Sequence, residues 1–364
     1  MSRLTRAETQ ERNRAKVLAA ARDEFVRSGY REAKVDRIAE RAGLTRGAVY
    51  SNFPGKRALY LAVLAEHLAR PLDAPHWALG RTVADALGAL ARSWVARLPL
   101  TGEPRPLDAD LVPEVLADET VRRPYAQLTR LGAVLLGLTL EELRPGRRLV
   151  RVAEAALTTL YGARQLSVAA PGFVEPFNVV RACAALADVD LGDEWLEPGL
   201  ATRALPVDEP WTPPAGTSLV TGEPVRLTDD GVVAILGLHR ASAAEDIVRA
   251  APPGAAVTAV LVTGDPAELG TLATVVLTDV IASLRQAVPA TALPRLRVVC
   301  DEPGAIAAAA GVSAVSDATE TVVRVAAGRL TGRAEGLGAG HTAGAPQGMP
   351  AARERPPGRS RPTP

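Results

Sequence analysis

The sequence predicts a multidomain protein, with an all-α N-terminal two-thirds followed by a small α/β domain that has a mainly parallel sheet. Apolar residues recur at three- and four-residue spacing from about residue 14 to residue 187, as in amphipathic helices. Prolines then accumulate between residues 197 and 224. Beyond them, short apolar runs alternate with helical ones, a pattern typical of buried parallel strands joined by helices. With 364 residues, the chain has room for two or three domains.

Three short helices are expected at the N-terminus, covering Arg14 to about Ser28, Val35–Arg41, and Arg46 to about Asn52. Gly29 can end the first helix in the left-handed conformation. Gly43 allows a sharp turn after the second helix, and Thr45 is a good N-cap for the third. The segment from Lys34 to Phe53 is therefore predicted to form two short helices around a tight turn.

The charge of the chain is concentrated in this region. Residues 1–70 carry fifteen Lys and Arg against eight Asp and Glu, an excess of seven positive charges, whereas the whole chain has a net charge of +1. Such an asymmetry is expected of a segment that binds a polyanion. A helix-turn-helix with this charge predicts contact with double-stranded DNA.

The third helix has the residue types that a recognition helix needs. Gly47 and Ala48 are small enough to let the backbone approach base edges, and Arg46 can donate two hydrogen bonds to guanine. Hydroxyl and ammonium groups around it suit phosphate contacts. The residues predicted to meet DNA are Lys34, Val35, Thr45, Arg46, Gly47, Ala48, Tyr50, Ser51, Asn52 and Lys56.

Over residues 12–64 the sequence resembles the TetR family of bacterial transcriptional repressors. The matching residues are Phe25, Gly29, Tyr30, Ile38, Ala39, Ala42, Gly43, Leu44, Thr45, Gly47, Tyr50, Phe53, Lys56 and Leu59. Val35 stands where the family often has threonine, and Asn52 where it often has histidine. The helical layout to about residue 190 is also similar, but the C-terminal third is not covered.

This resemblance implies that the helices after the N-terminal DNA-binding region, or head, bind a small effector and form a homodimer. The dimer would use the last two helices, about Arg147–Val168 and Glu175–Asp188. Side chains that could line the effector cavity are Trp94, Tyr125, Tyr161, Gln165 and Phe173. Aromatic residues at helical spacing are also ordinary core residues, so both interpretations stay open, and the effector is not identified.

Beyond the prolines, strands are expected at Val225–Leu227, Val232–Leu238, Val257–Val262, Leu296–Cys300 and Val312–Val315. Helices are expected at Ala243–Ala250, Ala267–Ala287, Ala305–Ala310 and Ala318–Ala327. Polar groups follow three strands, at His239 and Arg240, Thr263 to Asp265, and Cys300 to Glu302. They suit a ligand site at the carboxyl ends of the strands, or simple helix caps.

The sequence divides into five segments. These are a helix-turn-helix DNA-binding domain at 10–56 with its motif at 34–53, a helical ligand-binding and dimerisation domain at 57–190, a Pro-rich linker at 197–224, an accessory α/β domain at 225–330, and a disordered tail at 331–364. No catalytic motif, cofactor-binding motif or metal-ligand spacing is found, so no cofactor is expected. No run of about 18 apolar residues predicts a membrane span.

The functional prediction is a cytoplasmic, sequence-specific DNA-binding regulator that acts as a ligand-responsive dimeric repressor and is not an enzyme. Its partners would be a double-stranded DNA operator, an unknown small-molecule effector and a second copy of the chain. An alternative is a regulator fused to a C-terminal α/β enzyme or small-molecule-binding module, or to an oligomerisation module. The operator sequence and the regulated genes are not predicted by any of these features.

Overall fold

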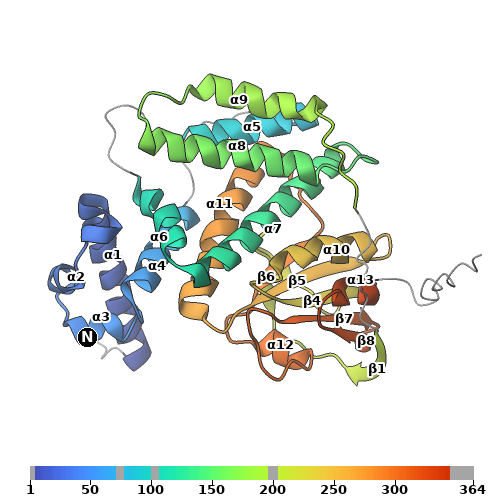
Figure 1. Cartoon of the computed structure of the whole chain (residues 1–364). Coiled ribbons are helices and arrows are strands. Elements are labelled where there is room, and N and C mark those ends of the chain that lie inside the picture. The colour runs from blue at the N-terminus through green and yellow to red at the C-terminus, as the bar shows by residue number, and fades with distance from the viewer. Residues whose placement is uncertain (1–4, 71–77, 100–105, 196–203, 345–364) are drawn as a thin grey trace, which may run out of the picture.

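The computed structural model describes residues 5–70, 78–99, 106–195 and 204–344. Its first four helices form the head, which lies at one side of the molecule (Figure 1). They are α1 (Arg6–Glu32), α2 (Val35–Ala42), α3 (Arg46–Tyr50) and α4 (Lys56–Ala69). α1 begins eight residues before the predicted Arg14, because Thr5 and Glu8 form a capping box there. Gly29 interrupts α1 one turn before its end, with φ 70° and ψ 169°.

The helical middle continues with α5 (Val83–Val95), η1 (Leu107–Asp110), α6 (Leu111–Ala117), α7 (Glu119–Leu143), α8 (Val150–Ala169), α9 (Pro176–Ala185) and η2 (Leu186–Asp188). Periodicity predicts five helical stretches here, and each overlaps one or more of these elements: Val83–Leu98, Leu107–Ala117, Leu128–Leu138, Leu149–Val168 and Phe177–Leu186. α8 and α9 run along one side of the molecule, with α5 behind them (Figure 1). A continuous cluster of buried apolar side chains joins α5, α7 and α8.

The C-terminal part contains a six-stranded mixed sheet in the order β1-β8-β7-β4-β5-β6. Its strands are β1 (Leu205–Pro210), β4 (Gly231–Gly237), β5 (Ala256–Val262), β6 (Arg297–Cys300), β7 (Glu320–Ala326) and β8 (Arg329–Glu335). The β4–β5 and β5–β6 pairs are parallel, whereas β4–β7, β7–β8 and β8–β1 are antiparallel. The predicted mainly parallel sheet is therefore wrong.

The error has two local causes. Residues 318–327 were predicted to be helical, but Thr321, Val322, Val323 and Val325 are β-branched and form β7. β8 begins at Arg329 and runs on into segment 331–364, which was predicted to be a disordered tail. That prediction is wrong for residues 331–335 and for α13 (Ala339–Gly344), while residues 345–364 lie outside the described part of the chain.

The Pro-rich segment 197–224 also contains structure where a linker without a folded element was predicted. It includes β1, the short strand β2 (Gly216–Thr217) and the first residue of β3 (Pro224–Val225), although residues 197–203 lie outside the described residues. Pro206 and Pro210 are compatible with β1 because it is an edge strand that pairs only with β8. Residues 312–315, expected as a strand, are irregular instead, with a bend at Ser313 and Ala314.

Short helical elements complete the C-terminal part: η3 (Ala241–Ala243), α10 (Ala244–Ala250), η4 (Pro266–Gly270), η5 (Ala290–Ala292) and α12 (Ala305–Ala309). α12 and Trp211 cover one face of the sheet. The other face packs toward α7, α10 and α11 (Thr271–Ala287) and belongs to the same apolar cluster as the helical middle. The predicted accessory domain thus shares a hydrophobic core with the helices that precede it.

α11 is the central element of this shared core (Figure 1). It follows β5 and packs against α4, α5 and α7. The stretch Pro266–Ala287 is long and apolar enough to cross a membrane, with a mean hydropathy of 1.5, but 61% of the tested window is buried inside the protein. Its position in the core accounts for its composition, since the core helix of a globular protein has the same character.

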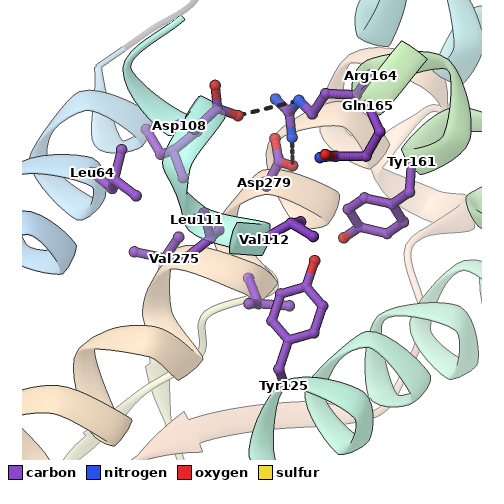
Figure 2. A pocket seen from close by; sticks show the side chains of 12 residues that line it. Leu64, Asp108, Leu111, Val112, Tyr125, Tyr161, Arg164, Gln165, Val275 and Asp279 are labelled. Atoms are coloured by element: carbon purple, nitrogen blue, oxygen red, sulfur yellow. Dashed lines mark hydrogen bonds and ion pairs between the residues drawn. The ribbon is translucent and has the colours of Figure 1, made fainter. Parts of the chain in front are cut away.

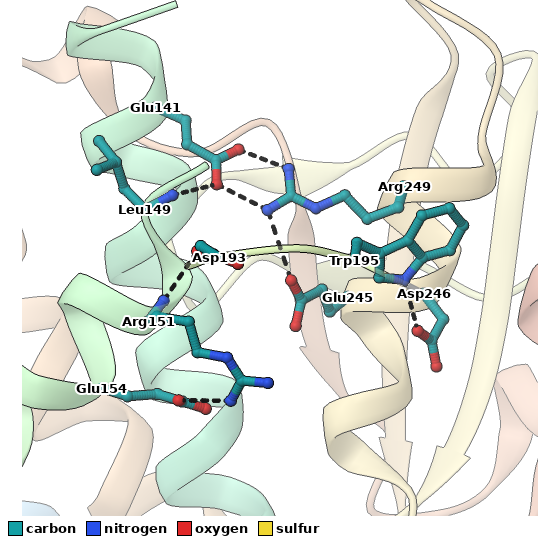
Figure 3. A network of polar contacts seen from close by, with 9 residues as sticks. All are labelled: Glu141, Leu149, Arg151, Glu154, Asp193, Trp195, Glu245, Asp246 and Arg249. Carbon is teal, nitrogen blue, oxygen red and sulfur yellow. Dashed lines mark hydrogen bonds and ion pairs between the residues drawn. The ribbon is translucent and has the colours of Figure 1, made fainter. Parts of the chain in front are cut away.

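A polar network forms a second junction between the helical middle and the sheet (Figure 3). Arg249 of α10 donates hydrogen bonds of 2.5 and 2.7 Å to Glu141 of α7, and Glu141 also accepts the backbone N–H of Leu149 at 3.0 Å. Trp195 donates its indole N–H to Asp246 at 2.9 Å. The Arg249–Glu141 and Trp195–Asp246 bonds join residues that are 108 and 51 positions apart, so they fix α10 against α7 and against the segment that follows α9.

Candidate nucleic-acid interface and effector cavity

The turn between α2 and α3 has the geometry that its sequence predicts. Gly43 adopts the left-handed conformation with φ 65° and ψ 37°, and its N–H donates to the carbonyls that end α2. Thr45 caps α3 by accepting the Ala48 N–H at 3.2 Å. Val49 and Phe53 are buried with Ile38 in the apolar core of the head. These contacts fix α3 with its other face toward solvent.

The solvent face of α3 carries several of the predicted DNA contacts. Arg46, Gly47, Tyr50 and Ser51 are exposed, as are Thr45 and Lys34 before their helices. A Cβ atom at Gly47 would meet only the Thr45 hydroxyl, at 3.9 Å. The internal packing of the head therefore does not require a glycine at this position, whereas close approach of a ligand to the backbone would.

Arg46 is held loosely at this surface. Its guanidinium lies 3.2 Å from Asp36 and 5.5 Å from the centre of the Tyr50 ring. Both partners of the ion pair are exposed, and such pairs contribute little to stability because water competes for them. Arg46 can thus exchange Asp36 for another acceptor at small cost.

Other predicted contacts are engaged inside the head. Lys56 donates to the backbone carbonyls of Arg31 and Ala33, at 3.0 and 3.2 Å, and lies over the Tyr30 ring. Asn52 donates to the carbonyl of Ala48 at 2.8 Å. Val35 is half-buried and packs against the apolar core of the head. Ser51 donates to Ala48 at 2.9 Å but remains exposed.

Two charged residues that support the head were missed from the sequence. Arg14 places its guanidinium over the Phe53 ring at 4.5 Å and donates to the carbonyl of Asn52 at 3.4 Å. Glu24 is buried, pairs with Arg27, and lies 3.7 Å from Arg37 of α2. Its place on the apolar face of α1, directly before Phe25, was the available signal.

A small cavity lies between α4, α6, α7, α8 and α11 (Figure 2). It is lined by Leu64, Leu68, Asp108, Leu111, Val112, Tyr125, Tyr161, Arg164, Gln165, Val275, Val276 and Asp279. Its volume is about 30 Å³, enough for one or two water molecules. Three of the five predicted effector residues, Tyr125, Tyr161 and Gln165, line it.

The other two predicted effector residues lie elsewhere. Trp94 is buried beside the cavity, with its ring edge-on to Tyr161 at 5.2 Å, and is not part of the lining. Phe173 is 72% exposed and lies outside the cavity, before α9. Aromatic spacing alone does not separate these positions, because all of them lie on or beside helices of the same region.

Buried charges meet at the cavity wall. Asp279 of α11 accepts hydrogen bonds from Arg97 at 2.5 Å and from Arg164 at 2.8 Å, and Arg164 also pairs with Asp108 at 3.2 Å. Burial alone would raise the pKa of Asp279, but the two guanidinium groups outweigh it and lower the pKa below its usual value. Burial likewise raises the pKa of Tyr125 to about 12.

Two of the polar groups at the ends of the C-terminal strands, Asp265 and Asp301, accept N–H groups at the starts of the following helices. Asp265 accepts the Glu268 N–H at 3.0 Å, and Asp301 accepts the N–H groups of Ala305 and Ala307 at 3.0 and 2.9 Å. Arg240 pairs with buried Glu320 at 2.7 Å. The sequence allowed either a ligand site or helix caps at these strand ends, and the contacts of Asp265 and Asp301 are those expected of helix caps.

Comparison with known proteins bears on the head. Residues 17–63 match the family described as bacterial regulatory proteins, tetR family. The head of this chain is thus similar to the DNA-binding region of TetR-family regulators. A stretch of 73 residues is 48% identical to the HTH-type transcriptional regulator SrpR of Pseudomonas putida, and covers 20% of this chain and 33% of SrpR.

Two further TetR-type relatives show the same pattern. The match to the uncharacterised regulator TtgW of Pseudomonas putida is 48% identical and spans 20% of this chain and 53% of TtgW. The match to the transcriptional activator FasR of Mycolicibacterium smegmatis is 40% identical and spans 21% of this chain and 34% of FasR. The matched stretch thus spans about a third to a half of these relatives.

Solved TetR-family structures also resemble the chain. A regulator from Rhodococcus sp. RHA1 is 17% identical with a TM-score of 0.33, over 50% of this chain and 95% of that one. NalD, the secondary repressor of the MexAB-OprM efflux pump in Pseudomonas aeruginosa, is 20% identical with a TM-score of 0.32, over 49% and 95%. Likeness of this degree identifies neither a ligand nor an assembly.

Proposed function

We propose that this protein is a cytoplasmic, dimeric, effector-responsive repressor that binds a DNA operator through its TetR-family head. The observation that carries this proposal is the geometry of α2, the turn at Gly43 and α3, which leaves Arg46, Gly47, Tyr50 and Ser51 on one exposed face. Residues 1–70 also carry an excess of seven positive charges, which favours association with a polyanion. Repression, rather than activation, is the predicted direction of control.

In this proposal α3 enters the major groove with its N-terminal end toward the bases. Arg46 leaves Asp36 and donates two hydrogen bonds to a guanine, while the Ala48 methyl group contacts a thymine methyl. Thr45, Tyr50, Ser51 and Lys34 contact phosphates and set the orientation of the helix. Lys56 acts inside the head, because its ammonium already binds two carbonyls at the end of α1.

The proposal is tested by selecting duplexes from a random pool with the full-length protein and measuring affinity for the best one at several salt concentrations. Phosphate contacts release counterions, so about six of them predict a loss of roughly 10³-fold between 50 and 200 mM salt. An affinity that does not change with salt would contradict the assignment of the head. A failure to enrich any sequence would contradict specific recognition.

Replacing Arg46 with Ala should relax the preference for one base per half-site, at a cost of about 1–3 kcal/mol for that base pair. The protein should remain folded, since the Arg46–Asp36 pair is exposed. The test measures the affinities of wild type and Arg46→Ala for operator duplexes that carry each of the four bases at each position. If Arg46→Ala weakens every operator variant equally, Arg46 contacts a phosphate instead.

The surface of α8 and α9 supports the proposed homodimer. Phe177 is 78% exposed, and Leu166 at the end of α8 is also exposed. A Cβ atom at Gly162 would meet nothing within 4 Å, so close helix approach is possible there. Exposed aromatic side chains are enriched at surfaces that another chain covers. A two-fold pair of heads would also read two half-sites.

Phe177→Asp should dissociate this dimer. A carboxylate in an apolar interface loses hydration without gaining a partner, so we expect dimerisation to weaken at least 100-fold, or about 3 kcal/mol. Sedimentation equilibrium over a concentration series measures the change. Leu205→Asp, at an exposed apolar position on edge strand β1, is the matched control and should not alter the dimer. Equal behaviour of the two variants would place the interface elsewhere.

We further propose that the cavity beside Tyr125 is where the effector binds. Its polar handles are Gln165 and the two tyrosine hydroxyls, set in a mostly apolar wall. At about 30 Å³ it is closed in this conformation, so an effector must stabilise a second conformation in which the wall has opened. Such a shift would alter the separation of the heads and release the operator.

A further inference from the structure

The C-terminal segment reaches the DNA-binding head directly. α11 packs along α4, and Val275 of α11 belongs to the same apolar cluster as Phe25 and Tyr60 of the head. The opposite side of α11 faces α5 and α7. α4 follows the turn after α3 with only five residues between the two helices. A displacement of α11 would therefore act on α4, which is linked to the recognition helix α3 by those five residues.

A charged cluster ties the beginning of α11 to the beginning of α4. Arg57, in the first turn of α4, donates to Glu268 of η4 at 2.7 Å and to Asp118 at 2.5 Å. Asp118 is the N-cap of α7 and accepts the Thr120 N–H at 2.9 Å. All three charged side chains are partly buried. This Arg57 clamp, formed by Arg57, Glu268 and Asp118, joins the head, the helical middle and the C-terminal segment.

The far end of α11 is fixed as well. Asp279 is held by Arg97 and Arg164, Gln286 accepts a hydrogen bond from Ser93 at 2.9 Å, and the Ala287 carbonyl accepts the Gly80 N–H at 2.7 Å. The same helix lies between β5 and β6 in the chain and packs on the sheet. α11 thus behaves as a rigid connection, since each of its ends is bound to a different part of the protein.

We propose that the C-terminal α/β segment sets the orientation of the DNA-binding head through α11 and the Arg57 clamp, and so controls operator affinity. The inference rests on the proposed DNA-binding function. Hydrogen bonds of 2.5–2.7 Å do not survive a displacement of an ångström or more, so the clamp is either closed or broken. A closed clamp fixes α4 against α7 and α11, and a broken clamp lets the head turn about the η1 contacts that remain.

The contacts between the head and the η1–α6 segment limit this motion. Asp110 of η1 accepts the Tyr30 N–H at 2.8 Å, and the Leu107 carbonyl accepts the Tyr60 hydroxyl at 2.8 Å. Arg31 lies 3.9 Å from Glu114. They hold the body of the head on η1 and α6, whereas the clamp alone connects its α4 to the start of α11 through charged groups among the described residues.

The experiment compares operator affinity of the full-length wild type, Arg57→Met, Glu268→Gln and the double variant. Arg70→Met is the matched control, because Arg70 directly follows α4 and its ion-pair partner within the described part of the chain is exposed Glu66. We expect Arg57→Met to change the dissociation constant at least fivefold beyond Arg70→Met. Glu268→Gln should change it in the same direction, and the double variant should equal the larger single change.

The direction of the two shifts distinguishes the clamp from a general charge effect. Without a clamp, loss of a positive charge weakens DNA binding and loss of a negative charge strengthens it, so opposite shifts would overturn the proposal. Equal values for Arg57→Met and Arg70→Met would also overturn it. Glu268→Gln preserves the size of the side chain, so this variant still tests the clamp if Arg57→Met does not fold. If the wild type binds no duplex at low salt, the proposed DNA-binding function fails instead.

Discussion

A chain that ends at residue 199 should fail to form a stable helical middle. Seven large apolar residues of α11 are at most 3% exposed in the intact protein: Leu272, Val275, Val276, Leu277, Val280, Ile281 and Leu284. Burial of such side chains contributes about 10–20 kcal/mol in total. Part of the buried area of α11 faces the sheet, so roughly half of this stabilisation comes from its contacts with α4, α5 and α7 and is lost from them. This loss is comparable to the whole stability of a typical domain, about 5–15 kcal/mol.

Circular dichroism during heating measures this effect. We expect the truncated chain to show no cooperative transition above the temperature at which the intact protein is half unfolded, and to bind an apolar dye. A chain ending at Gly344 is the control, because it retains every contact described above. Cooperative unfolding of the truncated chain at an unchanged temperature would show that the helical middle forms its core without α11.

Asp279→Asn should destabilise the protein by about 3–5 kcal/mol, as expected when one member of a buried charge cluster is removed. Asp279 is only 7% exposed at its side chain and is shared by Arg97 and Arg164. The amide preserves shape but leaves two guanidinium groups with Asp108 as the remaining carboxylate at 3.2 Å from Arg164. Urea denaturation gives the free energies of unfolding of the two proteins.

Asp229→Asn is the control for this change, because Asp229 pairs with Arg297 at 3.0 Å at a more exposed position. It should cost less than about 1 kcal/mol. The two guanidinium groups lower the pKa of Asp279, so its carboxylate contributes stability above the pKa of about 3.9 found in unfolded chains. That contribution is lost as pH falls through the lower folded pKa, so the difference between wild type and Asp279→Asn should shrink there. A difference that does not shrink as pH falls below the unfolded pKa would assign the cost to packing.

Local signals were sufficient to predict the head. Gly43 requires a positive φ and Thr45 caps α3 with its own side chain, so both residues determine structure within a few positions of themselves. The outward face of α3 follows from the same local geometry. Lys56 was predicted as a phosphate contact because its partners, the carbonyls of Arg31 and Ala33, lie more than twenty residues away. No pattern within α4 indicates that contact.

The C-terminal part shows where local patterns fail. β7 contains four β-branched residues, but Ala318, Ala326 and Ala327 lie at its ends, and a short apolar run of this kind cannot be assigned to a buried helix or a buried strand from its periodicity. Its pairing decides between them: β4 lies about 90 positions earlier in the chain, and β8 follows directly after a two-residue turn. Asp279 was not predicted as a residue of the cavity wall, because the helix that carries it lies in a segment predicted to be a separate domain.

The contact between α11 and α4 limits how this protein can be rebuilt. Modular regulators are commonly recombined by exchanging the DNA-reading part at the boundary after it. Here a graft joined at residue 56 would keep Arg57 with its partner Glu268, but would replace Phe25 and the other α1 residues that share an apolar cluster with Val275, which lies more than 200 residues downstream. A functional chimera would therefore need a first helix whose apolar face fits α4 and α11 of this chain.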